Sequence, residues 1–183
     1  MGDAKNVNQW SGADVFIAPV GTAEPSDLTT AWAVDWDPVG LLNGEEGFNW
    51  AREEESGEFY AWGGILVKKT KSKHKRTVTF VALEDNPVVF ELVNPGSSQT
   101  VAGGVTTSRV KVPQSRDFAI GFELREGAKV KRRMVKRATA EVTSETKESE
   151  TEPTVYTITV TLYPESDATL YTELSGDTAA LGG

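Results

Sequence analysis

The side chains that most often carry out catalysis are scarce in this sequence. Its 183 residues include no cysteine and one histidine, His74, which lies inside a lysine-rich run. Disulfides, thiolate metal sites and cysteine nucleophiles are therefore excluded, and a Ser–His–Asp triad has only His74 to use. Because no acid–base partner stands near His74 in the sequence, we expect it to be a solvent-exposed bystander.

Carboxylates, by contrast, are abundant, in the runs Glu45-Glu46, Glu53-Glu54-Glu55 and Glu84-Asp85. A glycosidase needs two carboxyl groups at a defined separation in a cleft, whereas a charged surface is the commoner cause of such runs. The glycines at 103–104 match no phosphate-binding loop, because no P-loop lysine and serine follow them. The sequence therefore predicts a protein that is not an enzyme, with no catalytic residue, no cofactor and no metal site.

The chain is acidic and long enough for one hydrophobic core. It has 27 acidic and 19 basic residues, a formal net charge of −8 and 38% hydrophobic residues, as expected for a soluble globular protein. No apolar run approaches the roughly 20 residues of a membrane span. The N-terminal residues also lack the basic-then-apolar pattern of a secretion signal. We therefore expect no membrane partner.

Two basic tracts stand out against this acidic background, at residues 68–76 and 129–137. The first resembles a nuclear-localisation or nucleic-acid patch. It is also typical of a solvated turn or an edge strand whose lysines prevent pairing between sheets. A third interpretation is a charge contact between subunits, in which the tracts pair with the acidic segments 53–58 and 145–152 of a neighbour. Nucleic-acid binding by the two tracts is the alternative function.

The elements that must position these residues are mostly strands. Residues 77–83 have the two-residue period of a half-buried strand and lead directly into one short helix, at about residues 87–94. Asn86 is a preferred N-cap residue and Pro87 suits the first helical position. Pro95-Gly96 ends the helix. We find no other convincing helix, so the sequence predicts a mainly β protein with one short flanking helix.

Three later strands are predicted to form a meander, at residues 116–125, 129–143 and 154–163. In the first, Asp117 and Glu123 face away from the apolar side chains. In the second, the expected apolar face holds Val130, Met134, Ala138, Ala140 and Val142. The third alternates most clearly, and its polar face, expected to point to solvent, consists of Thr157, Thr159 and Thr161.

The chain is divided here into three parts. A flexible N-terminal arm (1–13) precedes a single β domain (14–163), and a flexible C-terminal tail (164–183) follows it. The remaining elements expected in the domain are strands at 14–20 and 105–112, a bent or edge strand at 31–42, and a Gly/Ser-rich connector at 97–107.

Residues 43–64 are unusual because glycines frame two aromatic clusters, Phe48 with Trp50 and Phe59-Tyr60 with Trp62, around an acidic run. One interpretation is a hairpin whose aromatic side chains fill the core of the domain. The other is a long assembly loop that reaches a neighbouring subunit through aromatic anchors and a charged rim. The sequence leaves both interpretations open.

Two stretches resemble a known family. The opening VFIAPVGTAEPSD, followed by WAVDWDPVGLLNGEEGFNW, is similar to the start of major tail proteins of long-tailed, non-contractile phages that infect actinobacteria. The stretch KRTVTFVALEDNPVVFELVNPG, in which a strand leads through E-x-N-P into a short helix, is similar to the same family. The resemblance covers most of residues 14–163, and the basic tract 68–76 departs from it.

The resemblance implies a tail tube protein with a β-sandwich or barrel-like fold and one flanking helix. It further implies rings of six subunits that stack into a hollow tube, through which genomic DNA passes without sequence-specific binding. The implied partners are other copies of the chain, a tape-measure protein and the tail terminator and tip proteins. The implied location is the virion tail, assembled in the host cytoplasm.

These expectations select two sets of residues. The candidates for subunit and ring interfaces are Phe48, Trp50, Glu53, Glu54, Glu55, Phe59, Tyr60, Trp62, Lys68, Lys69, Lys71 and Lys73. The candidates for lining the channel are Asp117, Glu123, Thr157, Thr159 and Thr161, because an acidic and polar lumen repels phosphates and lets DNA slide.

Overall fold

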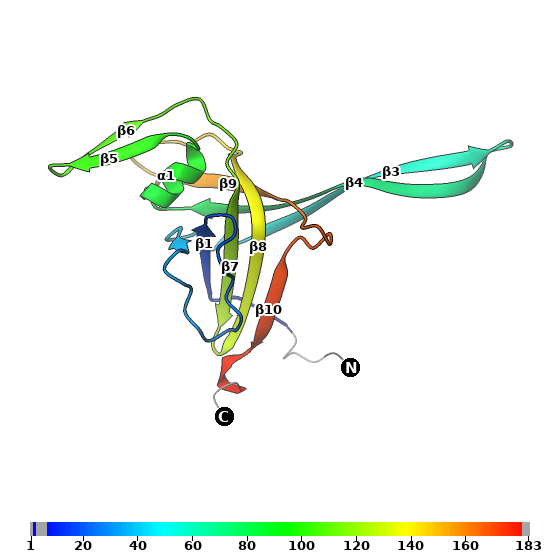
Figure 1. Ribbon diagram of the computed structural model, residues 1–183, viewed down its shortest axis with the longest axis horizontal. Coiled ribbons are helices and arrows are strands. Elements are labelled where there is room, and N and C mark those ends of the chain that lie inside the picture. The colour runs from blue at the N-terminus through cyan, green and yellow to red at the C-terminus, as the bar shows by residue number, and fades with distance from the viewer. Residues whose placement is uncertain (1, 3–6, 181–183) are drawn as a thin grey trace.

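The computed structural model describes residue 2 and residues 7–180, and within them the chain is built mainly from antiparallel strands (Figure 1). One sheet contains eight strands, in the order β2-β1-β7-β8-β9-β4-β3, with β10 paired to β8. The strands of this sheet are β1 (Gly12–Ala18), β2 (Asp37–Pro38), β3 (Asn49–Ala61), β4 (Ile65–Ala82), β7 (Phe118–Glu126), β8 (Lys129–Val142), β9 (Tyr156–Leu162) and β10 (Thr172–Asp177). The other elements are the helix α1 (Pro87–Val93), the two-stranded sheet of β5 (Ser98–Ala102) and β6 (Val105–Arg109), and a 3₁₀ turn, Thr178–Ala180. The predicted mainly β fold and the β7-β8-β9 meander are confirmed.

The large sheet curls until its two ends meet across the core. Phe48 and Trp50, at one end, lie with ring centroids 5.2 Å and 5.3 Å from that of Phe122 in β7. The segment between β2 and β3 completes the curl: the Val39 amide donates to the Val15 carbonyl at 2.8 Å, and the Asn43 amide donates to the Val81 carbonyl at 2.9 Å. The fold is therefore barrel-like, and this closure removes much of the exposed edge of the sheet.

Helix α1 begins as the sequence predicts. The Asn86 side chain accepts a hydrogen bond from the Val89 amide at 2.9 Å and donates another to the Val39 carbonyl at 2.8 Å, so the cap ties the helix to the strand layer. Val89 and Leu92 are buried in the main core, whereas Phe90 is only partly buried. The helix covers one flank of the core (Figure 1) and is anchored by its two aliphatic residues.

A β-bulge in β8 overturns the predicted single apolar face of that strand. Ile120 lies opposite Val135, but Phe118 lies opposite Ala138, so β8 carries one extra residue between the two pairs. An extra residue reverses which side of the sheet the later side chains occupy. Met134, opposite Gly121, therefore lies on the outer side of the sheet, and Ala138 lies on the core side.

Several boundaries differ from those predicted. The strand expected at 31–42 is reduced to Asp37–Pro38, because most of that segment forms a loop over the outer face of the sheet. The connector expected at 97–107 instead contains β5, which pairs with β6. At the N-terminus β1 begins at Gly12, within the predicted arm, and residues 1 and 3–6 of that arm lie outside the described residues.

The tail predicted at 164–183 also contains regular structure. Residues 172–177 form β10, which pairs with the first half of β8 and places Glu173 opposite Arg133. The Arg133 guanidinium donates to the Glu173 carboxylate at 2.6 Å, and Tyr171 packs on Trp50 with ring centroids 5.4 Å apart. The prediction of a frayed tail was wrong for these residues, because an ion pair and an aromatic contact dock them; residues 181–183 lie outside the described part.

Candidate assembly surfaces

The β3–β4 hairpin extends well beyond the body of the protein (Figure 1). Its strands pair from Asn49 opposite Thr79 to Ala61 opposite Ile65, with irregularities at Glu53/Glu55 and Phe59/Tyr60. The strand predicted at 77–83 is thus the end of one continuous strand, β4. We call residues 53–75 the arm and residues 59–67, around its turn, the tip.

The sequence left two interpretations open for residues 43–64, and the two aromatic clusters of that segment lie in different surroundings. Phe48 and Trp50, which precede the arm, pack against the core and are not available as interface anchors in the folded chain. At the tip, Trp62 is fully exposed, and Phe59 and Tyr60 expose 61% and 59% of their surface. The first aromatic cluster therefore belongs to the core, and the second stands in solvent.

The tip is apolar as well as exposed. Ile65, Leu66 and Val67 follow the turn and are also largely in solvent. The turn itself uses Gly63 and Gly64 at φ of +87° and +79°, a region that glycine adopts without steric cost. Within the described part of the chain no other element covers this surface. Exposed apolar patches of this kind mark contact sites.

Acidic residues of β3 neutralise much of the basic tract 68–76 from across the hairpin. Lys69 lies 3.1 Å from the Glu58 carboxylate, Lys71 lies 2.9 Å from that of Glu54, and the Lys73 ammonium lies 2.9 Å from Glu55. The acidic segment 53–58 thus pairs with the tract within one chain. Among the charged residues of the predicted interface set, Glu53 and Lys68 take no part in these pairs, and both are exposed.

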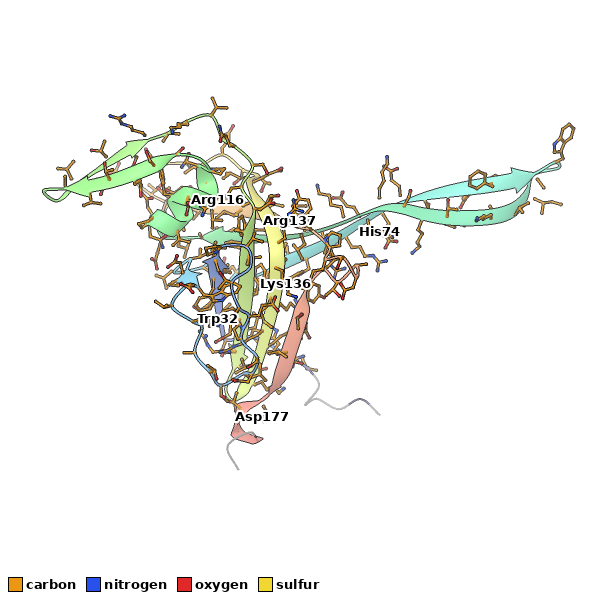
Figure 2. The ribbon with its side chains drawn as sticks, viewed as in Figure 1. Trp32, His74, Arg116, Lys136, Arg137 and Asp177 are labelled. Carbon is orange, nitrogen blue, oxygen red and sulfur yellow. The ribbon has the colours of Figure 1, made fainter. Side chains whose placement is uncertain are left out.

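His74 lies on the arm, between the body and the tip (Figure 2). Its side chain is 61% exposed, and its Nδ1 atom lies 3.3 Å from the Glu54 carboxylate. Nothing in the described residues completes a catalytic set around it, and no group of three histidine, aspartate or glutamate side chains there is placed to hold a metal ion.

A second projection, formed by β5 and β6, leaves the body on the side opposite the arm (Figure 1). Among the described residues its strands pair only with each other, and Val101 and Val105 are largely exposed. An isolated two-stranded sheet is marginally stable in water. This hairpin is therefore a second surface that contact with another molecule would stabilise.

The threonines of β9 form the polar face that the sequence predicts. Ile158 and Val160 are buried, whereas the alternating positions are only partly buried. The Thr159 hydroxyl lies 2.8 Å from that of Thr79 and 3.1 Å from that of Thr143, so hydroxyl pairs connect three neighbouring strands. This polar face is completed by Thr157 and Thr161.

Glu123 does not lie on an exposed surface, and its assignment as a channel-lining residue was wrong. It is 6% exposed, because the loop between β1 and β2 covers this side of the sheet. The indole nitrogen of Trp32, in that loop, donates to its carboxylate at 2.8 Å, and Arg132 donates at 2.7 Å. Burial alone would raise the pKa of Glu123, but the hydrogen bonds from Trp32 and Arg125 and the charge of Arg132 hold it below its ordinary value.

Arg132 also binds the loop between β1 and β2. Its guanidinium donates to the carbonyl oxygens of Asp27 and Thr30 at 2.9 Å and 2.7 Å. Sequence reasoning missed this buried cluster. The available signal was the charge of Arg132, which lies between Val130 and Met134 on one face of β8 and opposite the charge of Glu123 in the paired strand. Asp117, by contrast, stays at the surface, where Arg137 donates to it at 2.8 Å.

The second basic tract, 129–137, is also paired within the chain. Arg132 is buried against Glu123, Arg133 bonds Glu173, and Lys136 donates to Glu165 at 2.8 Å. The predicted acidic partner at 145–152 makes its own internal ion pair, between Lys147 and Glu152. The tract therefore contributes to the stability of β8 more than to an open basic face.

These features are those of a protein that makes contacts through projecting hairpins, and comparison with known families agrees. A family model described as "Phage tail tube protein" matches residues 3–182, which is nearly the whole chain. The chain belongs to the phage tail tube protein family.

Family membership confirms that the sequence motifs were those of a phage tail tube protein and makes the chain a structural component of the bacteriophage tail. A search of curated proteins finds no match. None of the helices in the described residues is long and apolar enough to cross a membrane.

Proposed function

We propose that this chain self-assembles into stacked rings of six subunits, and that the rings form the tube through which phage DNA reaches the host. The observation that carries the proposal is the arm, a long two-stranded projection whose apolar tip nothing in the described chain covers. The family match supports the tube as the product of assembly. Tail assembly in the host cytoplasm, and contacts with tape-measure, terminator and tip proteins, belong to the same proposal.

The arrangement of the two projections suits a head-to-tail contact. The arm and the β5–β6 hairpin leave opposite sides of the body, so each copy can reach two different neighbours. Contacts between unlike surfaces generate rings when the rotation closes and filaments when it does not. The interface residues proposed here are therefore those of the tip, with the ion-paired shaft of the arm as a spacer.

The polar β9 face is our proposed lining of the channel, with Asp117 as its acidic contribution. A surface of hydroxyl groups with few cations offers DNA phosphates no strong binding site, so that DNA slides. Glu123 is excluded from this lining by its burial.

The alternative, nucleic-acid binding by tracts 68–76 and 129–137, has less support. Acidic partners within the same chain neutralise many of the cations of both tracts, as described above. Binding through phosphate contacts would show as an affinity for DNA that falls steeply with salt.

Negative-stain microscopy of the concentrated, purified chain tests the proposal. We expect rings or stacked tubes, and little retention of DNA at physiological salt. A chain that stays monomeric at high concentration and binds DNA in a salt-sensitive way would contradict the proposal and favour the alternative.

A further inference from the structure

A groove opens in the body of the protein between the start of β1, the loop before β3 and the first half of β8. It has a volume of about 740 Å³, and its lining includes Trp10, Leu41, Gly44, Phe48, Lys131 and Arg133. That volume is within the range of roughly 300–1,000 Å³ that protein pockets use for ligands. Leu41 is largely exposed, so the groove presents an apolar wall to solvent.

The floor of the groove carries cations that already lie over aromatic rings. The Lys131 ammonium is 5.5 Å from the Trp10 ring centroid, and the Arg133 guanidinium is 4.6 Å from that of Trp50. Cations held in this way attract the face of a further aromatic ring. Glu173 is the ion-pair partner of both cations, at 3.5 Å from Lys131 and 2.6 Å from Arg133, and Asp14 and Glu84 also line the groove. The part of the groove that suits an aromatic side chain is therefore its apolar and aromatic lining, formed by Trp10, Leu41 and Phe48.

We propose that this groove receives the tip of the arm from a second copy of the chain, with Trp62 as the anchor. The inference rests on the proposed tube function and names the contact that would carry it. Trp62 is the fully exposed ring of the tip, and it precedes a Gly-Gly turn that leaves a narrow end. Its indole would pack against the apolar and aromatic side chains that line the groove.

The occupant must be another copy, because the arm holds its own tip away from its own groove. β3 begins beside the groove at Asn49 and runs for 13 residues to the turn. At about 3.3 Å per residue, the tip stands roughly 40 Å from the start of the strand. A tip in one copy and a groove in the next give a head-to-tail contact, which propagates along an assembly and does not stop at a dimer.

The surface offered by the tip is large enough for a specific contact. An aromatic side chain buries about 150–250 Å², so the exposed parts of the three tip rings amount to about 330–550 Å². A standard interface buries roughly 800 Å² on each partner. The aliphatic residues Ile65, Leu66 and Val67 supply much of the difference.

Two variants separate the halves of this contact. Trp62→Ala removes the anchor and leaves the groove intact. Gly44→Trp fills the groove and leaves the tip intact, and a side chain at Gly44 meets no atom within 4 Å of its Cβ. Both sites are exposed, so both variants should fold. Val34→Trp, in an exposed loop away from the groove, is the control for adding a tryptophan.

Each variant alone should raise the critical concentration for assembly at least tenfold, because the tip anchor is expected to behave as a binding hot spot. At concentrations at which neither variant assembles alone, their mixture should form a one-to-one complex, measured by sedimentation. In that complex the tip of the Gly44→Trp chain occupies the groove of the Trp62→Ala chain. The chain that carries both changes should bind neither variant, and Val34→Trp should assemble like the unaltered chain.

Assembly of Gly44→Trp at the unaltered concentration would overturn the docking, because the tip would then bind elsewhere or to another tip. Absence of the one-to-one complex would also overturn it. If the unaltered chain forms tubes while these results go against the groove, the docking fails and the tube function stands. If the variants form their complex but the unaltered chain forms only open chains without tubes, the docking stands and the tube function fails.

Discussion

The buried ion pair between Glu123 and Arg132 makes the sharpest prediction about stability. The carboxylate and the guanidinium are 2.7 Å apart, with side chains only 8% and 5% exposed. Glu123→Ala leaves the Arg132 charge buried without its partner and leaves the Trp32 indole nitrogen without an acceptor. Removing one partner of such a pair costs about 3–5 kcal/mol, so the free energy of unfolding should fall by that amount.

Urea denaturation followed by tryptophan fluorescence measures this loss. With a urea m-value of about 2 kcal/mol/M for a chain of this size, the midpoint should fall by about 1.5–2.5 M. Asp117→Ala is the matched control, since it breaks an ion pair of similar length, to Arg137, whose side chains are both exposed. That change should cost about 0–1 kcal/mol.

A loss for Glu123→Ala no larger than that of the control would refute the reasoning. A second comparison separates the buried charge from simple loss of packing. Replacing both partners with apolar side chains, Glu123→Leu with Arg132→Met, should recover much of the lost stability, because no unpaired charge then remains buried.

Four further outcomes are expected. Leu92→Ala should cost about 2–5 kcal/mol in thermal or urea unfolding, and Phe90→Ala clearly less than the 3–5 kcal/mol of a buried phenylalanine; equal costs would mean that Phe90 anchors the helix. In Gly121→Val the new side chain should overlap the Trp32 ring, lower the free energy of unfolding by about 1–3 kcal/mol and shift the tryptophan emission to the red. Unchanged emission would contradict the position of Trp32 over Gly121. Because the folded pKa of Glu123 is depressed below 4.5, its stabilisation is present above about pH 4.5 and is lost as pH falls through the folded value. Glu123→Gln should therefore flatten the acid limb of a stability–pH curve. Charge reversal of Lys69, Lys71 and Lys73 to glutamate should increase amide exchange in the arm while the body stays folded, because it places carboxylates beside Glu58, Glu54 and Glu55. Reversal of Lys68, which lies opposite Phe59, should have a smaller effect.

The elements that local patterns determine could be predicted from the sequence. Strand β9 alternates threonine with apolar residues, and the structure keeps that alternation. Helix α1 has its N-cap at Asn86 and its proline at the first helical position, as the sequence indicates. Both depend on residues within a few positions of each other, where propensity and capping decide the outcome.

The elements that distant contacts determine could not be predicted. One extra residue in β8 exchanges the faces of the strand after Val135, and no local pattern marks it. The burial of Glu123 depends on a loop about 90 residues earlier, and β10 forms because Glu173 meets Arg133 on β8. In each case the partner is far away in the sequence, so composition near the residue carries no signal.

The division of the aromatic residues between core and tip follows from strand lengths. β9 pairs with β4 only from Arg76 to Ala82, and it ends at Leu162, shortly before Pro164. From Ile65 to Lys75, β4 has β3 as its one neighbour within the described chain, so this part of the hairpin has no sheet to pack against. Trp50 lies opposite Val78, on the body side of Arg76, and packs against the core. Trp62 lies at the far end of the hairpin, where no further strand of the described chain is present to cover it. The exposed tip is therefore a consequence of a short β9 beside a long β4. A longer β9 would pair with β4 along the arm and change the surface that we propose for assembly.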